Sequence, residues 1–219
     1  MTFSIVARDR LTGAFGAAAA TGTPVVGALV LHLAADVGAI ATQGLSTNPL
    51  YGTHGLRLLE AGLTAKDACQ KLVEEDDGRE SRQLVITDRN GQTAGWTGAD
   101  NVEATHMILA KDVALAANWV ASQDVIVAAR AAFGGSDAPT FAGRLIDALS
   151  AGERAGGDSR GLRSAAVRIV CRDHPPVDLR ADFDSQPILR LAEIHLATLD
   201  PDFQAFLARV PTIADPSRR

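Results

Sequence analysis

The order in which strand-like and helix-like segments follow one another most constrains the fold of this chain. Four segments with the apolar patterns of β-strands come first, and two helical segments follow. The same order of four strands and two helices is then repeated. Strands and helices do not alternate singly, which argues against a doubly wound parallel sheet. The order permits an α+β fold, a four-layer α-β-β-α sandwich of two antiparallel sheets.

Turn signals between apolar segments set the expected boundaries, and the clearest is Asn90-Gly91, a pair typical of hairpins. We predict strands over residues 2–9, 14–20, 25–34, 37–43, 83–88, 93–98, 105–110, 113–118, 164–172 and 178–182. We predict helices over residues 56–61, 64–77, 122–133, 138–151 and 187–207, the last with Leu189, Ala192, His195 and Leu196 facing inward. Residues 44–55 are predicted to be a loop, rich in polar and turn residues, that could contribute to a site.

Length and charge bound the class of protein. The 219 residues suit one domain over residues 1–219, in which about ten C-terminal residues form a tail. The net charge of -5, with dispersed arginines, argues against nucleic-acid binding. No apolar run reaches membrane-spanning length and no signal-peptide pattern precedes the first strand, so we expect a cytoplasmic protein without a membrane partner.

Neither cysteines nor histidines form a recognisable metal or redox motif. Cys69 and Cys171 have no CxxC partner and are expected to be reduced thiols. The five histidines show no ligand spacing, and no acidic residues cluster at such a spacing. We therefore expect no metal and no cofactor.

The first predicted strand contains the residue whose chemistry best suits it to act as a nucleophile. If Met1 is removed, Thr2 becomes the first residue, and its hydroxyl and free α-amine then belong to one residue. A threonine hydroxyl needs a base to become a good nucleophile. An N-terminal amine has a pKa of about 7.7–8.0, so it can act as that base near neutral pH. Many chains also begin Met-Thr without any such role.

Two further segments could serve the same chemistry. Asn118 ends a predicted strand, where its side-chain amide could bind an oxyanion or only satisfy the strand end. The glycine-rich segment 156–164 allows unusual backbone angles. Within it, Asp158, Arg160 and Ser164 could orient an N-terminal amine or hold a substrate carboxylate. The same segment could also be only a tight turn between a helix and a strand.

Taken together, several short motifs make the chain resemble the DUF1028 family, which is placed among the N-terminal nucleophile (Ntn) hydrolases. The similarity covers about residues 2–195 and rests on many motifs in one order. These are TFSIVARD (2–9), VGAIATQ (37–43), NPLYG (48–52), RQL (82–84), TG (97–98), Asn118, GGD (156–158), RG (160–161), SA (164–165) and DLR (178–180).

The resemblance implies a four-layer α-β-β-α fold and hydrolysis of an amide bond, with Thr2 as nucleophile and Asn118 as oxyanion donor. It implies substrate-binding or supporting roles for residues in the matching motifs, namely Gln43, Asn48, Tyr51, Asp158, Arg160 and Ser164. The expected partners are a small-molecule or short-peptide substrate and further copies of the chain, because this fold commonly forms homo-oligomers. The substrate itself is not implied.

The chain also departs from the family pattern. The basic residue usual after the second strand is absent, and Thr21-Gly22-Thr23 stands there. A cation near Thr2 would help to depress the pKa of the attacking group. Trp119 follows Asn118 where the family has methionine, and Arg163 replaces a glutamine. These departures keep an alternative open, a catalytically inactive protein that binds a small acidic metabolite between Asn48, Tyr51, Asn118 and Arg160.

Overall fold

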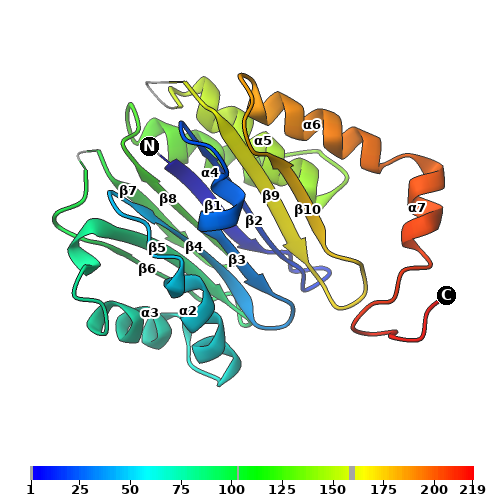
Figure 1. Cartoon of the computed structure of the whole chain (residues 1–219), viewed down its shortest axis with the longest axis horizontal. Coiled ribbons are helices and arrows are strands. Elements are labelled where there is room, and N and C mark those ends of the chain that lie inside the picture. Colours follow the sequence, from blue (N-terminus) through cyan, green and yellow to red (C-terminus); the bar gives the residue numbers. More distant parts are fainter. Residues whose placement is uncertain (1, 103, 158–160) are drawn as a thin grey trace.

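The computed structural model describes residues 2–102, 104–157 and 161–219, and within them the chain forms two antiparallel sheets and seven α-helices (Figure 1). The larger sheet has the strand order β10-β9-β2-β1-β8-β7, and the smaller sheet has the order β3-β4-β5-β6. The predicted mixed α+β architecture with two antiparallel sheets is therefore confirmed. The strands are β1 (Thr2–Arg8), β2 (Phe15–Thr21), β3 (Leu31–Ala34), β4 (Gly38–Gly44), β5 (Arg82–Asp88), β6 (Thr93–Thr97), β7 (His106–Ala110), β8 (Val113–Asn118), β9 (Ser164–Val170) and β10 (Val177–Ala181).

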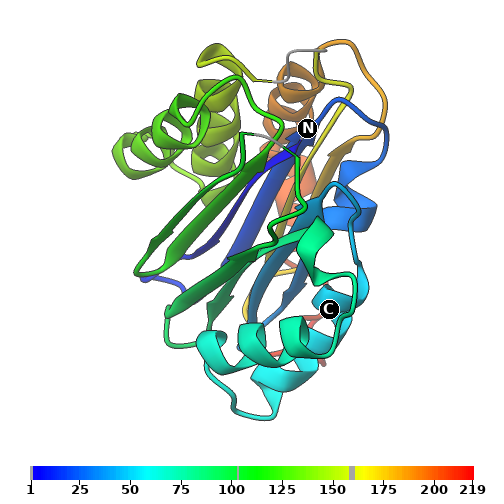
Figure 2. The ribbon, with the colours of Figure 1, turned by 90° about the vertical axis from the view of Figure 1, so that its left-hand side faces the viewer.

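Helices lie against the outer face of each sheet, as the two perpendicular views show (Figures 1 and 2). Side chains of β1 alternate between two apolar clusters: Phe3 and Ile5 pack toward α4 and α5, whereas Val6 packs between the sheets. A third cluster, which includes Tyr51, joins the smaller sheet to α2 and α3. The helices are α1 (Val26–Val30), α2 (Leu50–Glu60), α3 (Ala65–Glu74), α4 (Asp124–Gly135), α5 (Phe141–Arg154), α6 (Pro187–Thr198) and α7 (Pro201–Leu207).

The alanine run of β2 shows how sheet packing overrides helix propensity. Residues 17–20 are all fully buried, and they alternate between the cluster under the helices and the cluster between the sheets. Small side chains let the neighbouring layers approach closely. At Gly16 an added Cβ would lie only 2.7 Å from the ring of Phe141. The strand predicted there is confirmed for this packing reason.

Two predictions in the first half of the chain are wrong. The strand predicted over residues 25–34 begins only at Leu31, because Val26–Val30 form the short helix α1 as the chain passes from one sheet to the other. Val25 has a left-handed backbone (φ 58°), which turns the chain into that helix. The loop predicted over residues 44–55 ends early, since α2 already begins at Leu50.

The C-terminal helix was also predicted as one element, but the structure has two. Pro201 cannot donate a backbone hydrogen bond within a continuous helix, and Asp200 instead caps α7 by accepting bonds from residues 202 and 203. The predicted inward positions Leu189 and Leu196 are exposed, whereas Ile188 and Leu191 are buried. None of the described helices is both long and apolar enough to cross a membrane.

Candidate functional site

Four polar side chains form one row at the end of the larger sheet. The strand register places Ser164 opposite Thr21, Thr21 opposite Thr2, and Thr2 opposite Asn118. Directly opposed residues of antiparallel strands point to the same face of a sheet. Thr2, Ser4 and Val6 point to the same face of β1, because side chains alternate along a strand. Val6 packs between the sheets, so the row faces the smaller sheet. The fold thus brings together three of the predicted site residues, Thr2, Asn118 and Ser164.

Thr2 is held from two sides. Its Oγ1 lies 3.1 Å from Oγ1 of Thr21, so one of the two hydroxyls donates to the other. Its backbone carbonyl accepts a hydrogen bond of 3.0 Å from Nε2 of Gln43, which reaches across from the smaller sheet. The Thr2 side chain is half-buried at the start of a strand, where its position is fixed by neighbours on both sides.

Gln43 is fully buried, and its amide orientation follows from its partners. The carbonyl of Thr2 can only accept, so Nε2 must be the atom that faces it. Oε1 then accepts from the hydroxyl of Ser4 at 2.7 Å. Nε2 also lies 2.9 Å from Oδ1 of Asn118 and 2.8 Å from Oε1 of Gln83. The two hydrogens of Nε2 are therefore shared among three acceptors, and Asn118 presents its oxygen because two amide nitrogens at 2.9 Å would set donor against donor.

The orientation of Gln83 supports the same assignment independently. Its Nε2 donates to the backbone carbonyl of His106 at 3.3 Å and to Oγ1 of Thr97 at 3.0 Å, which leaves Oε1 facing Gln43. Asn118, only 2% exposed, therefore has its oxygen occupied. Within the part of the chain that the structure describes, no group accepts a hydrogen bond from its Nδ2. This amide can donate to a group that enters beside Thr2.

The hydroxyl of Ser164 is bonded to the segment that leads into α1. Its hydroxyl donates to the carbonyl of Thr23 at 2.6 Å and accepts from the backbone N–H of Val26 at 3.1 Å. The side chain thereby fixes the start of α1 against β9. The predicted residues Asp158 and Arg160 lie outside the described residues. The flanking Gly156 and Gly157 have the positive φ angles, 132° and 41°, for which glycine is suited.

Asn48 and Tyr51 belong to a second polar cluster on the opposite face of the smaller sheet, and the structure does not bring them to Thr2. Nδ2 of Asn48 donates to Oδ2 of Asp76 at 3.0 Å, and Nε of Arg82 lies 3.2 Å from the same oxygen. Burial alone would raise the pKa of Asp76, but these hydrogen bonds outweigh it and lower the pKa to about 2.

The buried hydroxyl of Tyr51 forms no hydrogen bond of normal geometry within the described part of the chain, although the Asp76 carboxylate is near enough to interact with it. Burial, followed by the effect of the nearby carboxylate, raises the pKa of Tyr51. The phenol is therefore neutral, and it lies in the apolar cluster that joins α2 and α3 to the smaller sheet, away from the row that contains Thr2.

Several residues of the site were missed in the sequence: Ser4, Thr21, Gln83 and Thr97. Their signal was the placement of polar residues at inward positions of otherwise apolar strands, as in β4, where Ala39, Ala41 and Gln43 share one face. Trp119 is half exposed and has a left-handed backbone (φ 64°), which is rare for a bulky residue. The chain therefore turns sharply directly after Asn118.

Comparison with known proteins gives a family and a solved relative. The model of DUF1028, described as a family of unknown function, matches residues 2–191. The crystal structure of protein SPO2555 from Silicibacter pomeroyi, also assigned to DUF1028, has a TM-score of 0.94 and 35% sequence identity, and the match covers 99% of this chain and 98% of that one. Anbu (ancestral beta-subunit) from Yersinia bercovieri has a TM-score of 0.41 and 11% identity, with 95% and 98% of the two chains covered. No curated protein matches the chain.

Proposed function

The chain belongs to the DUF1028 family, whose function is unknown, and from that premise we propose that it is an Ntn amidohydrolase that cleaves a small amide or a short peptide. The observation that carries the proposal is the contact of Gln43 with both Thr2 and Asn118, which fixes a hydroxyl beside an unused amide donor. The two stacked antiparallel sheets with helices outside support an Ntn-type four-layer sandwich. A cytoplasmic homo-oligomer is part of the same proposal.

In the proposed reaction, removal of Met1 exposes the α-amine of Thr2. Oγ1 of Thr2 attacks the substrate carbonyl carbon, and the α-amine takes the hydroxyl proton. The C–N bond then breaks, the ammonium group returns the proton to the leaving amine, and an ester to Thr2 remains. Water, deprotonated by the same amine, hydrolyses this ester and regenerates the hydroxyl.

Asn118 would stabilise the negative charge that develops on the carbonyl oxygen. Its Oδ1 is held by Gln43, so its Nδ2 can donate without first reorienting. Donors that are fixed before the reaction are the effective ones, and a single donor of this kind is worth about 3 kcal/mol in the transition state. Gln43 acts here as a positioning residue.

The alternative is a catalytically inactive small-molecule-binding protein on the same scaffold, and one observation favours it. Where the family pattern places a basic residue, Oγ1 of Thr21 lies 3.1 Å from the Thr2 hydroxyl. A neutral hydroxyl does not depress the pKa of the attacking group as a cation would. In this case a ligand would bind at the Thr2 row and be recovered unchanged.

Acyl transfer to Thr2 provides the test. Protein that begins at Thr2 is incubated with a panel of aminoacyl amides and short peptides, quenched in acid, and its intact mass is measured. We expect an acyl adduct that maps to Thr2, and release of the amine product. Thr2→Ala should abolish both without changing the melting temperature. The control Thr12→Ala, at the far end of the same hairpin, should retain both. Ligand recovered intact, with no adduct, favours the alternative.

A further inference from the structure

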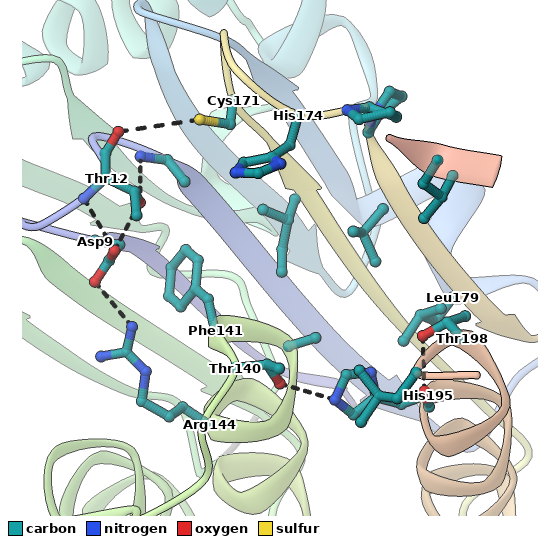
Figure 3. Close-up of a pocket in the computed structure, with 18 of the residues that line it drawn as sticks. Asp9, Thr12, Thr140, Phe141, Arg144, Cys171, His174, Leu179, His195 and Thr198 are labelled. Carbon is teal, nitrogen blue, oxygen red and sulfur yellow. Dashed lines mark hydrogen bonds and ion pairs between the residues drawn. The ribbon is translucent and has the colours of Figure 1, made fainter. Parts of the chain in front are cut away.

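A pocket of about 770 Å³ lies at the opposite end of β1 from Thr2 (Figure 3). Its walls come from the turn between β1 and β2, the start of α5, the β9–β10 hairpin, the end of α6, and α7. At about 3.3 Å per residue, the seven residues of β1 separate the two ends by about 20 Å. The pocket is therefore distinct from the row that contains Thr2.

Most of the pocket wall is apolar. Phe141 enters it from α5, Ile169 and Leu179 from the sheet, and Leu199 and Phe203 from the C-terminal helices. Leu179 is almost fully buried, whereas Leu199 and Phe203 are each about 40% exposed and form part of the rim. Pockets of about 300–1,000 Å³ with mainly apolar walls are typical sites for small organic ligands.

Several polar groups of the wall are bonded to one another, although Nδ1 of His195 is buried without a hydrogen-bond partner among the described residues. Asp9 accepts from Arg144 at 2.8 Å and from the hydroxyl of Thr12 at 2.6 Å (Figure 3). Although burial would raise the pKa of Asp9, these hydrogen bonds lower it, so its charge is matched by that of Arg144. The wall therefore contains a balanced ion pair at this side.

The second polar group of the wall is neutral. Nε2 of His195 lies 2.8 Å from Oγ1 of Thr140, and burial lowers the pKa of His195, so the imidazole is uncharged near pH 7. The hydroxyl of Thr198 donates to the carbonyl of His195. Of the other ionisable side chains, His174 and Asp178 are exposed to solvent, and Cys171 is a half-buried free thiol. The described wall thus offers an apolar interior without an unmatched buried charge.

We propose that this pocket binds an uncharged, largely apolar small molecule, such as an aliphatic alcohol or an aromatic compound. A charged group placed inside would lose its hydration without gaining a counter-ion, which is costly. An apolar body displaces water from Phe141, Leu179 and their neighbours, which is favourable. This site is independent of the proposed chemistry at Thr2.

A matched pair of fluorescent probes tests the proposal. N-Phenyl-1-naphthylamine is uncharged, and 1-anilinonaphthalene-8-sulfonate has the same ring system with an added anion. We expect saturable binding of one uncharged probe per chain, and binding of the sulfonate at least about tenfold weaker, because a buried charge without a partner is unfavourable. Absence of saturable binding, or equal affinity for the two probes, would overturn the proposal.

Variants locate the bound probe. Val177→Trp should fill the pocket and weaken binding of the uncharged probe at least about tenfold, because a bulky side chain occupies the apolar volume. Leu196→Trp, on the exposed side of α6, is the control and should bind as the wild type does. Leu199→Arg, a rim change that a folded chain tolerates more readily, should also weaken binding. Thr2→Ala should leave it unchanged, which separates this proposal from the proposed catalysis.

Two results would overturn the proposal, one for the location of the site and one for its occupant. One is wild-type affinity in both Val177→Trp and Leu199→Arg, with folding verified by circular dichroism. The other is a dimer, seen by analytical ultracentrifugation, that dissociates as the uncharged probe binds. A second copy of the chain, whose 95% exposed Leu11 lies at this rim, would then be the occupant.

Discussion

Two polar clusters lie on opposite faces of β4, and they differ in charge and in the hydrogen bonds that they leave unused. The Thr2 cluster, which is catalytic in our proposal, consists of Thr2, Ser4, Gln43, Gln83 and Asn118, all uncharged and placed between the sheets. The loop cluster consists of Asn48, Asp76 and Arg82 on the outer side, and it contains an ion pair. Both clusters are ordered by hydrogen bonds, so order alone does not identify a site.

The location of the unused hydrogen-bonding group distinguishes the two clusters, because the unpaired hydroxyl of Tyr51 is packed in an apolar cluster, whereas the unused amide of Asn118 lies beside Thr2. In the loop cluster, Asp76 accepts from Asn48, Arg82 and the backbone of Gly78, and Arg82 also donates to the carbonyl of Ser46. These bonds hold the loop that precedes α2. In the Thr2 cluster the amide Nδ2 of Asn118 remains unused among the described groups. A donor that remains available directly beside the Thr2 hydroxyl is suited to bind a group that enters there.

Of the substitutions that distinguish the two clusters, replacement of Asn118 should lower kcat the most. In Asn118→Ala we expect kcat to fall about 10²–10³-fold, because one fixed oxyanion donor is lost, while KM changes little. Steady-state kinetics on the substrate found in the acyl-transfer screen would measure this. Asn48→Ala is the matched control from the loop cluster and should keep kcat. Equal losses in both variants would remove the distinction between the clusters.

A charge introduced at Gln43 should have the next largest effect. In Gln43→Glu the carboxylate cannot donate to the carbonyl of Thr2, and it attracts the Nδ2 of Asn118 away from the site. We expect kcat to fall about 10–100-fold and the free energy of unfolding to fall by about 1–3 kcal/mol, because buried groups lose their partners.

Gln92→Glu, at an exposed position, is the control for the added charge and should behave as the wild type does. An amide flip of Asn118 should be visible in the crystal structure of Gln43→Glu as a changed hydrogen-bond pattern. Unchanged kcat together with a flipped Asn118 would show that this amide does not serve the reaction.

Neutralisation of Asp76 should have the smallest effect, and only on stability. The pKa of this carboxyl is lowered from 3.8 to about 2 in the folded chain, so its contribution is present above pH 4 and is lost as the pH falls from about 4 to 2. We expect Asp76→Asn to lower the free energy of unfolding by about 1–2 kcal/mol at pH 7, after allowance for partial solvent exposure.

Urea unfolding of Asp76→Asn and wild type at pH 7 and at pH 3 measures this dependence. The difference between the two proteins should shrink at the lower pH, and kcat per folded molecule should not change. The exposed neighbour provides the control Asp77→Asn, for which little effect is expected. A loss of kcat in Asp76→Asn at full stability would place the loop cluster in the reaction.

The sequence predicted most of the fold because local patterns determine it. The Asn90-Gly91 turn lies between β5 and β6 as expected, and the Thr64 hydroxyl caps α3 as its motif indicates. Helix α1 could not be predicted, because the apolar residues of its sequence also suit a strand. Its conformation depends on tertiary contacts, including the bond from its first residue to Ser164.

Two residues of the candidate site were predictable from the sequence, but the way in which the site is assembled was not. Thr2 and Asn118 could be proposed from their chemistry and position, but their side-by-side placement depends on the pairing of β1 with β8, which are far apart in sequence. The orientation of the Asn118 amide depends on Gln43 from the other sheet, so no local sequence pattern could predict it. For the same reason, Asn48 and Tyr51 were grouped with Thr2 although β4 lies between them.

The intact mass of the protein purified from its own cells tests the central claim most directly, because the proposed base exists only when Thr2 is the first residue. We predict a mass that corresponds to a chain without Met1, with Thr2 confirmed as the N-terminal residue by fragmentation. A fully retained Met1 would contradict the account, since the nitrogen of Thr2 would then be an amide that cannot accept the hydroxyl proton.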